Sequence, residues 1–277
     1  MTALLPRIDH VVINVRDRLD EAAGQYRRLG FHLTPRGHHS LGSSNNLAIF
    51  GSDYLELLGH EPGRGEQRAA LWQTPVGLSG LVFKPPASAD FAAELQGRGV
   101  PAEPPLEFFR PVALADGARE ARFQVVNIPG AVANGRVFFC RHFTPDLVWR
   151  DEWRTHPNGV RGIAAFVIAT DDPERSAATF KRIFGETAFA AIQGGLALAA
   201  GEATVRLLHH AEVARRYGAA VPGDEDGGER MVALDLRVAS LATTRAVLDG
   251  KASVIEESDR IIVPADAAFG VALSFQP

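Results

Sequence analysis

The first sixty residues alternate short apolar runs with polar turns, and this pattern predicts a strand, a helix and further strands. Residues 8–15 are mostly branched and apolar, which favours a strand. Apolar side chains then recur at helical spacing from Leu19 to Leu29, and Gly30 follows where a helix would end in a left-handed cap. Two further apolar runs, 46–50 and 54–58, flank a Gly-Ser-Asp turn typical of a hairpin. The segment therefore predicts one βαβββ module.

The same order recurs three more times along the chain. The third copy is the clearest, because residues 163–185 align without a gap with residues 8–30 at a constant offset of 155. The other two copies are predicted from strands at 78–84, 122–128 and 136–141 with a helix at 89–97, and from strands at 231–238, 260–263 and 269–275 with a helix at 240–248. Such a repeat decides the fold class. We expect an α+β protein of four βαβββ modules, paired into two tandem domains over residues 1–150 and 160–277.

Composition narrows the class of protein further. Hydrophobic residues make up 46% of the chain and charged residues 22%, which is ordinary globular usage and excludes disorder. The net charge of −4 gives no reason to expect nucleic-acid binding. A single cysteine, Cys140, excludes an internal disulfide framework. No apolar run has the length of a membrane span and no signal peptide is evident, so we expect a cytoplasmic protein without a membrane partner.

Four stretches of sequence resemble a known family. Residues 8–13, Ile-Asp-His-Val-Val-Ile, and 54–58, Tyr-Leu-Glu-Leu-Leu, resemble the vicinal oxygen chelate superfamily of glyoxalase I, extradiol dioxygenases and bleomycin-resistance proteins. Together with residues 39–45 and 138–159, they are similar to its "glyoxalase-like domain" family. The resemblance implies paired modules that curve around a cleft, with ligands of a divalent metal ion on the first and fourth strands. It also implies two tandem domains of the vicinal-oxygen-chelate type.

Two residues match the ligand positions of the family in the first module. His10 matches the first-strand position, and Glu56 matches the fourth-strand position on the face of Tyr54 and Leu58. The resemblance thus implies that both hold the metal and that Glu56 is catalytic. Without the resemblance, a hydrogen-bonded core histidine is the favoured interpretation of His10. Glu56 could lie on the outer face of an edge strand, although a carboxylate inside an apolar strand is costly unless paired.

The third ligand is where the sequence departs from the family pattern. The first-strand position of the second module falls near Gly80, which offers no ligand. On the fourth strand, His142 shares a face with Phe138 and Cys140 and could take the place of the usual glutamate. Alternatively, His142 caps the strand or stacks on a neighbouring aromatic ring. With His10 and Glu56, it would complete a set of two histidines and a carboxylate, which suits several divalent ions.

Further positions concern the substrate and the second half. His39 and Asn45 match polar positions of the resembling family, so we expect them to bind substrate, although a solvated loop is the alternative. At the offset of the repeat His10 corresponds to Ala165, and alignment of the fourth strands places Arg206 opposite Glu56. Both ligand positions are lost there. The second half is therefore interpreted as a degenerate copy.

Three functions remain open on the sequence. The leading hypothesis is a metal-dependent enzyme that acts on a small oxygen-bearing substrate by lyase, isomerase or dioxygenase chemistry, with zinc, iron, manganese or nickel as the ion. The alternative is a non-catalytic small-molecule binding protein of the bleomycin-resistance type, which the missing ligand at Gly80 favours. A purely structural role is the third, and the carboxylate at Glu56 argues against it. A homodimer is compatible with the resemblance, because related modules pair within and between chains.

Overall fold

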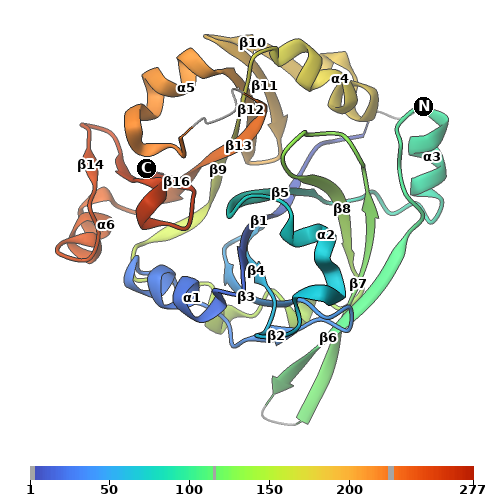
Figure 1. Cartoon of the computed structure of the whole chain (residues 1–277), viewed down its shortest axis with the longest axis horizontal. Coiled ribbons are helices and arrows are strands. Elements are labelled where there is room, and N and C mark those ends of the chain that lie inside the picture. The colour runs from blue at the N-terminus through green and yellow to red at the C-terminus, as the bar shows by residue number, and fades with distance from the viewer. Residues whose placement is uncertain (1–3, 115–116, 224–227) are drawn as a thin grey trace.

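The chain forms two curled eight-stranded sheets with helices packed against them, a mixed α+β fold (Figure 1). The computed structural model describes residues 4–114, 117–223 and 228–277. In the first sheet the strands are ordered β2-β3-β4-β1-β5-β8-β7-β6, and in the second β10-β11-β12-β9-β13-β16-β15-β14. The identical order confirms the repeat, because each sheet is two four-stranded modules joined edge to edge.

The first sheet contains two modules. The first module consists of β1 (Ile8–Arg16), α1 (Leu19–Arg28), β2 (Gly37–His38), β3 (Ser44–Ile49) and β4 (Tyr54–Gly59). The short helix α2 (Ala69–Trp72) follows, and the second module consists of β5 (Gly77–Phe83), α3 (Phe91–Gly97), β6 (Leu106–Leu114), β7 (Gly117–Asn127) and β8 (Arg136–His142). The central strands β1 and β5 pair antiparallel to each other. On one side β4 pairs parallel with β1, and on the other side β8 pairs parallel with β5.

The second sheet repeats this plan. Its modules are β9 (Val160–Thr170), α4 (Pro173–Phe184), β10 (Phe189–Ile192), β11 (Gly195–Ala200) and β12 (Ala203–His209), then β13 (Arg230–Val238), α6 (Leu241–Leu248), β14 (Ile255–Glu256), β15 (Ile261–Val263) and β16 (Ala272–Gln276). An additional helix, α5 (His210–Tyr217), lies between the two modules in the sequence.

Strand alternation separates an outer and an inner face in the first sheet. Val11, Ile13 and Val15 of β1 face outward, into a large core shared with helices and with the second sheet. Phe83 contacts Phe184 there, with 5.0 Å between ring centroids. On the inner face, Val12 belongs to a separate, smaller apolar cluster. The outer faces therefore hold the two halves together, and the inner face of the first sheet is left to line a cavity.

Three details differ from the pattern predicted by the sequence. Strand β6, with Pro111 and mostly exposed side chains, was not predicted, and its hairpin with β7 projects from the body (Figure 1). Helix α5 was not predicted either. The last strand begins at Ala272 rather than at Phe269, because Phe269 has a φ of 53° and lies in a turn.

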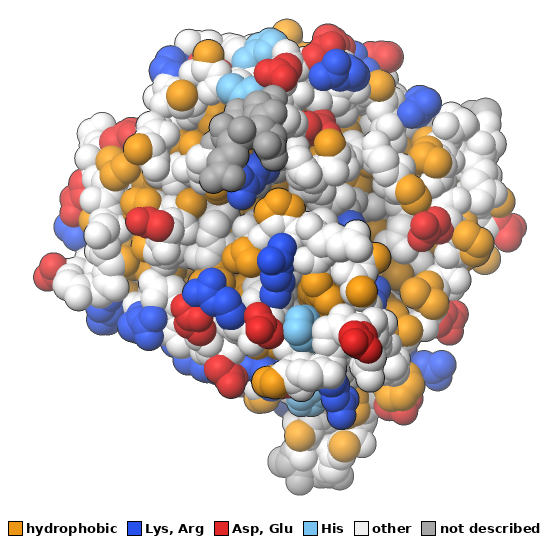
Figure 2. Space-filling model, in the orientation of Figure 1, with side chains coloured by type: hydrophobic (Ala, Val, Ile, Leu, Met, Phe, Trp, Pro, Cys, Tyr) orange, Lys and Arg blue, Asp and Glu red, His pale blue; other side chains and the backbone are white. Residues whose placement is uncertain are grey.

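None of the helices among the described residues is long and apolar enough to cross a membrane. On the face shown in Figure 2, acidic and basic side chains are interspersed.

Candidate active site

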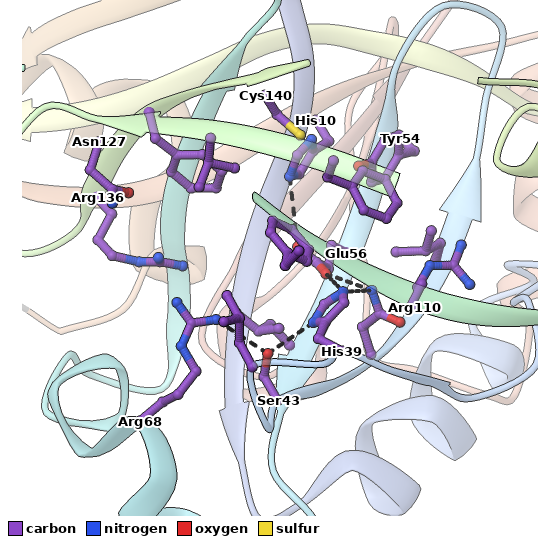
Figure 3. A pocket seen from close by; sticks show the side chains of 18 residues that line it. His10, His39, Ser43, Tyr54, Glu56, Arg68, Arg110, Asn127, Arg136 and Cys140 are labelled. Carbon is purple, nitrogen blue, oxygen red and sulfur yellow. Dashed lines mark hydrogen bonds and ion pairs between the residues drawn. The ribbon is translucent and has the colours of Figure 1, made fainter. Parts of the chain in front are cut away.

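The inner face of the first sheet encloses a cavity with about 610 Å³ of space free of protein atoms, its mouth included. One part of its wall is apolar and aromatic, formed among others by Phe108, Phe123 and Phe138. Four of the five residues that the sequence singled out also line it: His10, His39, Asn45 and Glu56 (Figure 3). Strands β1, β3 and β4, with the turn between β2 and β3 that carries His39, therefore bring these predicted residues together.

His10 is held by its sequence neighbour, Asp9. The β1–β5 pairing shifts register between Ile8 and His10, so that a bulge occurs at Asp9. A bulge changes the direction of a side chain that regular alternation would send to the other face. The Asp9 Oδ1 accepts a hydrogen bond from His10 Nδ1 at 2.7 Å, which leaves Nε2 of the ring directed toward Glu56.

Asp9 is an ionised group in a buried position. Burial alone would raise its pKa, but the charges and hydrogen bonds of His142 and His10 hold the pKa well below its ordinary value. An ionised carboxylate can only accept hydrogen bonds, so His10 must donate from Nδ1. The Nε2 atom then carries the free lone pair. This is the tautomer in which a histidine binds a metal ion through Nε2.

Glu56 is the one carboxylate in the described lining of the cavity, and it is 6% exposed. Asn45 donates a hydrogen bond from Nδ2 to Glu56 Oε1 at 2.7 Å. The other oxygen, Oε2, lies 3.7 Å from His10 Nε2. Burial tends to raise the pKa of Glu56, but interactions with His10 and His39 and the Asn45 bond lower it below its ordinary value. Glu56 is therefore an anion at neutral pH.

His39 supports Asn45. Its Nδ1 is 2.8 Å from Ser43 Oγ, and its Nε2 is 3.1 Å from Asn45 Nδ2. Burial lowers the pKa of His39 to about 4, so the ring is neutral at physiological pH. A neutral ring with Ser43 as acceptor at Nδ1 can accept from Asn45 at Nε2. His39 thus holds the Asn45 amide in place, and Asn45 in turn holds the Glu56 carboxylate.

The His10–Glu56 pair has the spacing of two metal ligands. Two donors at about 2.1 Å from one tetrahedral ion lie about 3.4 Å apart. The observed 3.7 Å between His10 Nε2 and Glu56 Oε2 is close to this separation and longer than a hydrogen bond. Both atoms belong to buried side chains with fixed partners on their other sides. The donor set therefore fits a divalent ion.

His142 lies outside the cavity lining, behind Asp9. Its Nε2 is 2.9 Å from Asp9 Oδ1 and 3.7 Å from Cys140 Sγ. Within the described ranges, Asp9, Cys140 and His142 are the one group of three ligand-type residues whose donor atoms all lie within 4.8 Å of one another. Burial, with Asp9 and Glu56 nearby, raises the pKa of Cys140 well above its ordinary value, so the thiol stays protonated. A protonated thiol is a poor metal ligand.

Gly80 explains why the second module offers no first-strand ligand. It pairs with Val12 in the β1–β5 ladder. A Cβ placed on Gly80 would approach the Val12 side chain to 2.8 Å, closer than real contacts allow. The close approach of the two central strands therefore requires glycine at this position.

Three arginines in the cavity were not predicted from the sequence. Arg68 comes from the 3₁₀ turn Gly65–Arg68, Arg110 from β6 and Arg136 from the start of β8. The available signal was weak: an arginine within an otherwise mixed strand pattern at 106–114 and another at the start of the strand at 136–141.

The second sheet lacks the corresponding site. Its register pairs Val167 with Arg206, as Val12 pairs with Glu56 in the first sheet, so Arg206 occupies the place of Glu56. Asp235 receives hydrogen bonds from Arg206 and from the Tyr217 hydroxyl of α5. Tyr217 is buried in the apolar cluster on this inner face, together with Val213 of the same helix. Helix α5 thus fills the space where the first half has its cavity.

Comparisons with known proteins agree with this architecture. The family model described as "Glyoxalase-like domain" matches residues 8–184, more than half of the chain. A search of curated proteins found no match.

Solved structures with a similar fold have low sequence identity. A hypothetical protein from Staphylococcus aureus is 12% identical with a TM-score of 0.66, and the match covers 98% of this chain and 99% of that one. A xylose isomerase-like TIM barrel/4-hydroxyphenylpyruvate dioxygenase fusion protein is 12% identical (TM-score 0.55, 100% of this chain, 50% of that one). A mutant 4-hydroxymandelate synthase from Streptomyces coelicolor is 11% identical (TM-score 0.54, 98% and 92%). On its family match and its paired modules, the chain belongs to the glyoxalase-like domain family of the vicinal oxygen chelate superfamily.

Proposed function

We propose that this protein is a metal-dependent enzyme that acts on a small oxygen-bearing substrate in the cavity of its first sheet. The proposal rests on the pair formed by His10 Nε2 and Glu56 Oε2, which lie 3.7 Å apart. Asp9 holds the other ring nitrogen of His10, and Asn45 holds the other oxygen of Glu56. The membership in the glyoxalase-like domain family supports it. Under this proposal, residues 1–150 are the working domain and residues 160–277 are its degenerate partner.

A divalent ion held here would polarise a carbonyl or hydroxyl oxygen of the substrate and stabilise negative charge that develops on it. His10 and Glu56 would hold the ion. The sequence also predicts His142 as a ligand, but in the structure its Nε2 is bound to Asp9. A ligand role for His142 through Nε2 would require this bond to break, and the role of His142 stays a prediction.

The other polar residues have positioning roles in this proposal. Asp9 keeps the Nε2 lone pair of His10 directed at Glu56. Asn45 holds one oxygen of Glu56, so the second oxygen is left for the ion or for a substrate proton. As the catalytic residue, Glu56 would accept a proton from a substrate carbon or hydroxyl group. His39 and Asn45 face the cavity and would also contact the substrate.

Metal analysis tests the proposal. Protein purified without chelator should contain close to one equivalent of a divalent metal, and His10→Ala and Glu56→Gln should each lose it. The exposed His32→Ala and Glu120→Gln serve as matched controls and should keep it. If the wild-type protein carries no metal and divalent ions do not raise its melting temperature, the enzyme would not be a metalloenzyme. The alternative of a metal-free small-molecule binding protein would then replace it.

A further inference from the structure

The cavity has an excess of positive charge that the proposed metal ligands do not use. Arg68, Arg110 and Arg136 all line it, while Glu56 is the one acidic side chain in the described lining. Arg110 is 3% exposed, and half-buried Arg136 begins β8 beside Gly80. Ionised groups this deep in a protein are normally paired, because an unpaired buried charge is costly.

These arginines lack partners that would compensate their burial. Arg110 Nη2 is buried without a hydrogen-bond partner. The structure records no hydrogen bond or ion pair between Arg136 and any described residue, and its guanidinium lies 5.1 Å from the Phe138 ring centroid. Arg68 makes a long hydrogen bond of 3.4 Å to Ser43 Oγ. An anionic ligand would supply the missing acceptors.

The arginines remain charged despite their burial. Burial, together with the like charge of Arg68, lowers the pKa of Arg136 to about 10, and burial lowers the pKa of Arg110 and of Arg68. Because an arginine guanidinium stays protonated in proteins, all three groups are positive at neutral pH, against the single negative charge of Glu56 in the described lining. The charge of Arg68 lowers the pKa of Arg136 because the two side chains lie near each other.

The positions of the arginines define where an anion would lie. Arg136 from β8 and Arg68 from the 3₁₀ turn extend toward each other on one side of the cavity, and Arg110 lies on the other side beside His39 (Figure 3). Glu56 lies between the two sides. Two guanidinium groups that approach from different elements can together bind the oxygens of one carboxylate or phosphate group.

The rest of the wall would contact an apolar part of the ligand. Phe108 and Phe123 stack with ring centroids 5.1 Å apart, and Phe138 and Val125 adjoin them in the lining. Aromatic and aliphatic side chains of this kind bind a flat or branched apolar body by burial of its surface.

We propose that the cavity binds a small molecule with an oxyanion group, a carboxylate or a phosphate, on an aromatic or branched apolar body, and that Arg68 and Arg136 hold the oxyanion. The inference names the substrate class of the site described under the proposed function and rests on that function for its location. It does not depend on a metal ion.

Binding of four simple probes tests the proposal. Benzoate, phenyl phosphate, benzamide and inorganic phosphate are titrated calorimetrically into chelator-treated full-length protein, with the melting temperature as a second readout. We expect at least one aromatic anion to bind, and benzamide, which has the same body without the charge, to bind at least tenfold more weakly. A preference for benzoate or for phenyl phosphate identifies the oxyanion. Inorganic phosphate should bind more weakly than phenyl phosphate, because it lacks the apolar body.

Substitutions localise the binding. Arg136→Gln and Arg68→Gln should each weaken the aromatic anion at least tenfold, whereas the exposed Arg64→Gln, near Arg68 in the same segment, should leave it unchanged. Arg68 lies on a partly exposed turn, so its substitution tests the pair even if Arg136→Gln impairs folding. Binding of benzamide as tight as that of the better-bound aromatic anion, no binding of either aromatic anion, or unchanged binding in Arg68→Gln would overturn the proposal. Absence of metal from protein purified without chelator, together with intact anion binding, would contradict only the proposed metal chemistry.

Discussion

Asp9→Asn is the most informative single substitution outside the proposed ligands. Asp9 Oδ1 accepts hydrogen bonds from both His10 Nδ1, at 2.7 Å, and His142 Nε2, at 2.9 Å. An asparagine has one oxygen acceptor and one amide donor in place of two equivalent oxygens. It removes the negative charge that both rings share. Both recorded bonds go to Oδ1, so the asparagine oxygen can still accept them, but its buried amide group takes the place of Oδ2 and requires an acceptor.

The magnitude follows from the two bonds. A hydrogen bond to a charged group contributes about 1.5–3 kcal/mol, and a buried donor left unsatisfied costs about 1–3 kcal/mol. Relief from the burial of a carboxylate offsets part of this loss. We therefore expect the free energy of unfolding to fall by about 1–3 kcal/mol. Loss of the carboxylate that supports a metal-binding histidine typically lowers metal affinity about 10–100-fold. We therefore expect Asp9→Asn to lower the metal affinity by about that factor.

Two measurements check this prediction. Urea denaturation gives the change in the free energy of unfolding, and competition with a chromophoric chelator gives the metal affinity. Asp151→Asn, whose side chain is 97% exposed, is the matched control and should change neither. Unchanged stability together with unchanged metal affinity in Asp9→Asn would refute the role of Asp9 in holding His10.

Two further substitutions test the architecture around the site. Gly80→Ala should lower the free energy of unfolding by about 1–3 kcal/mol, measured in urea, because its Cβ would meet Val12 at 2.8 Å; an unchanged midpoint would show that β1 and β5 can separate freely. Asp53 accepts a hydrogen bond from the Ile163 backbone, and burial raises its pKa to about 7, so the folded protein binds a proton that the unfolded chain releases near pH 4. Wild-type stability attributable to Asp53 therefore falls as pH rises from about 4 to 7, and Asp53→Asn should gain stability relative to wild type from pH 5 to pH 8. A constant difference in urea denaturation at the two pH values would contradict this.

The fold could be predicted from the sequence because its information is local and repeated. Apolar spacing identifies β1 and α1, and the positive φ of Gly30 matches its predicted place after the helix. The 155-residue offset relates the first strands of the two halves, and their registers correspond, since Val12 pairs with Glu56 and Val167 with Arg206. Strand β6 escaped prediction because most of its side chains are exposed, and hydrophobic alternation does not mark such a strand.

The site could be predicted only in part, for physical reasons. His10, Asn45 and Glu56 line one cavity because strand alternation and pairing bring their faces together, and His39 joins them from the turn before β3. Asp9 could not be predicted, because regular alternation places it on the face opposite His10 and only the bulge changes that. Arg68 comes from a turn that precedes the second module, and Arg110 and Arg136 come from strands β6 and β8 of that module. No local sequence pattern connects elements so far apart in the chain.

The central claim is that His10 and Glu56 hold a divalent ion in the cavity of the first sheet. Anomalous diffraction from crystals of the protein grown with zinc or manganese tests it most directly. We predict one strong anomalous peak between His10 Nε2 and Glu56 Oε2, within about 2.0–2.3 Å of each atom. A peak instead among Asp9, Cys140 and His142, or no peak on the inner face of the first sheet, would contradict the account.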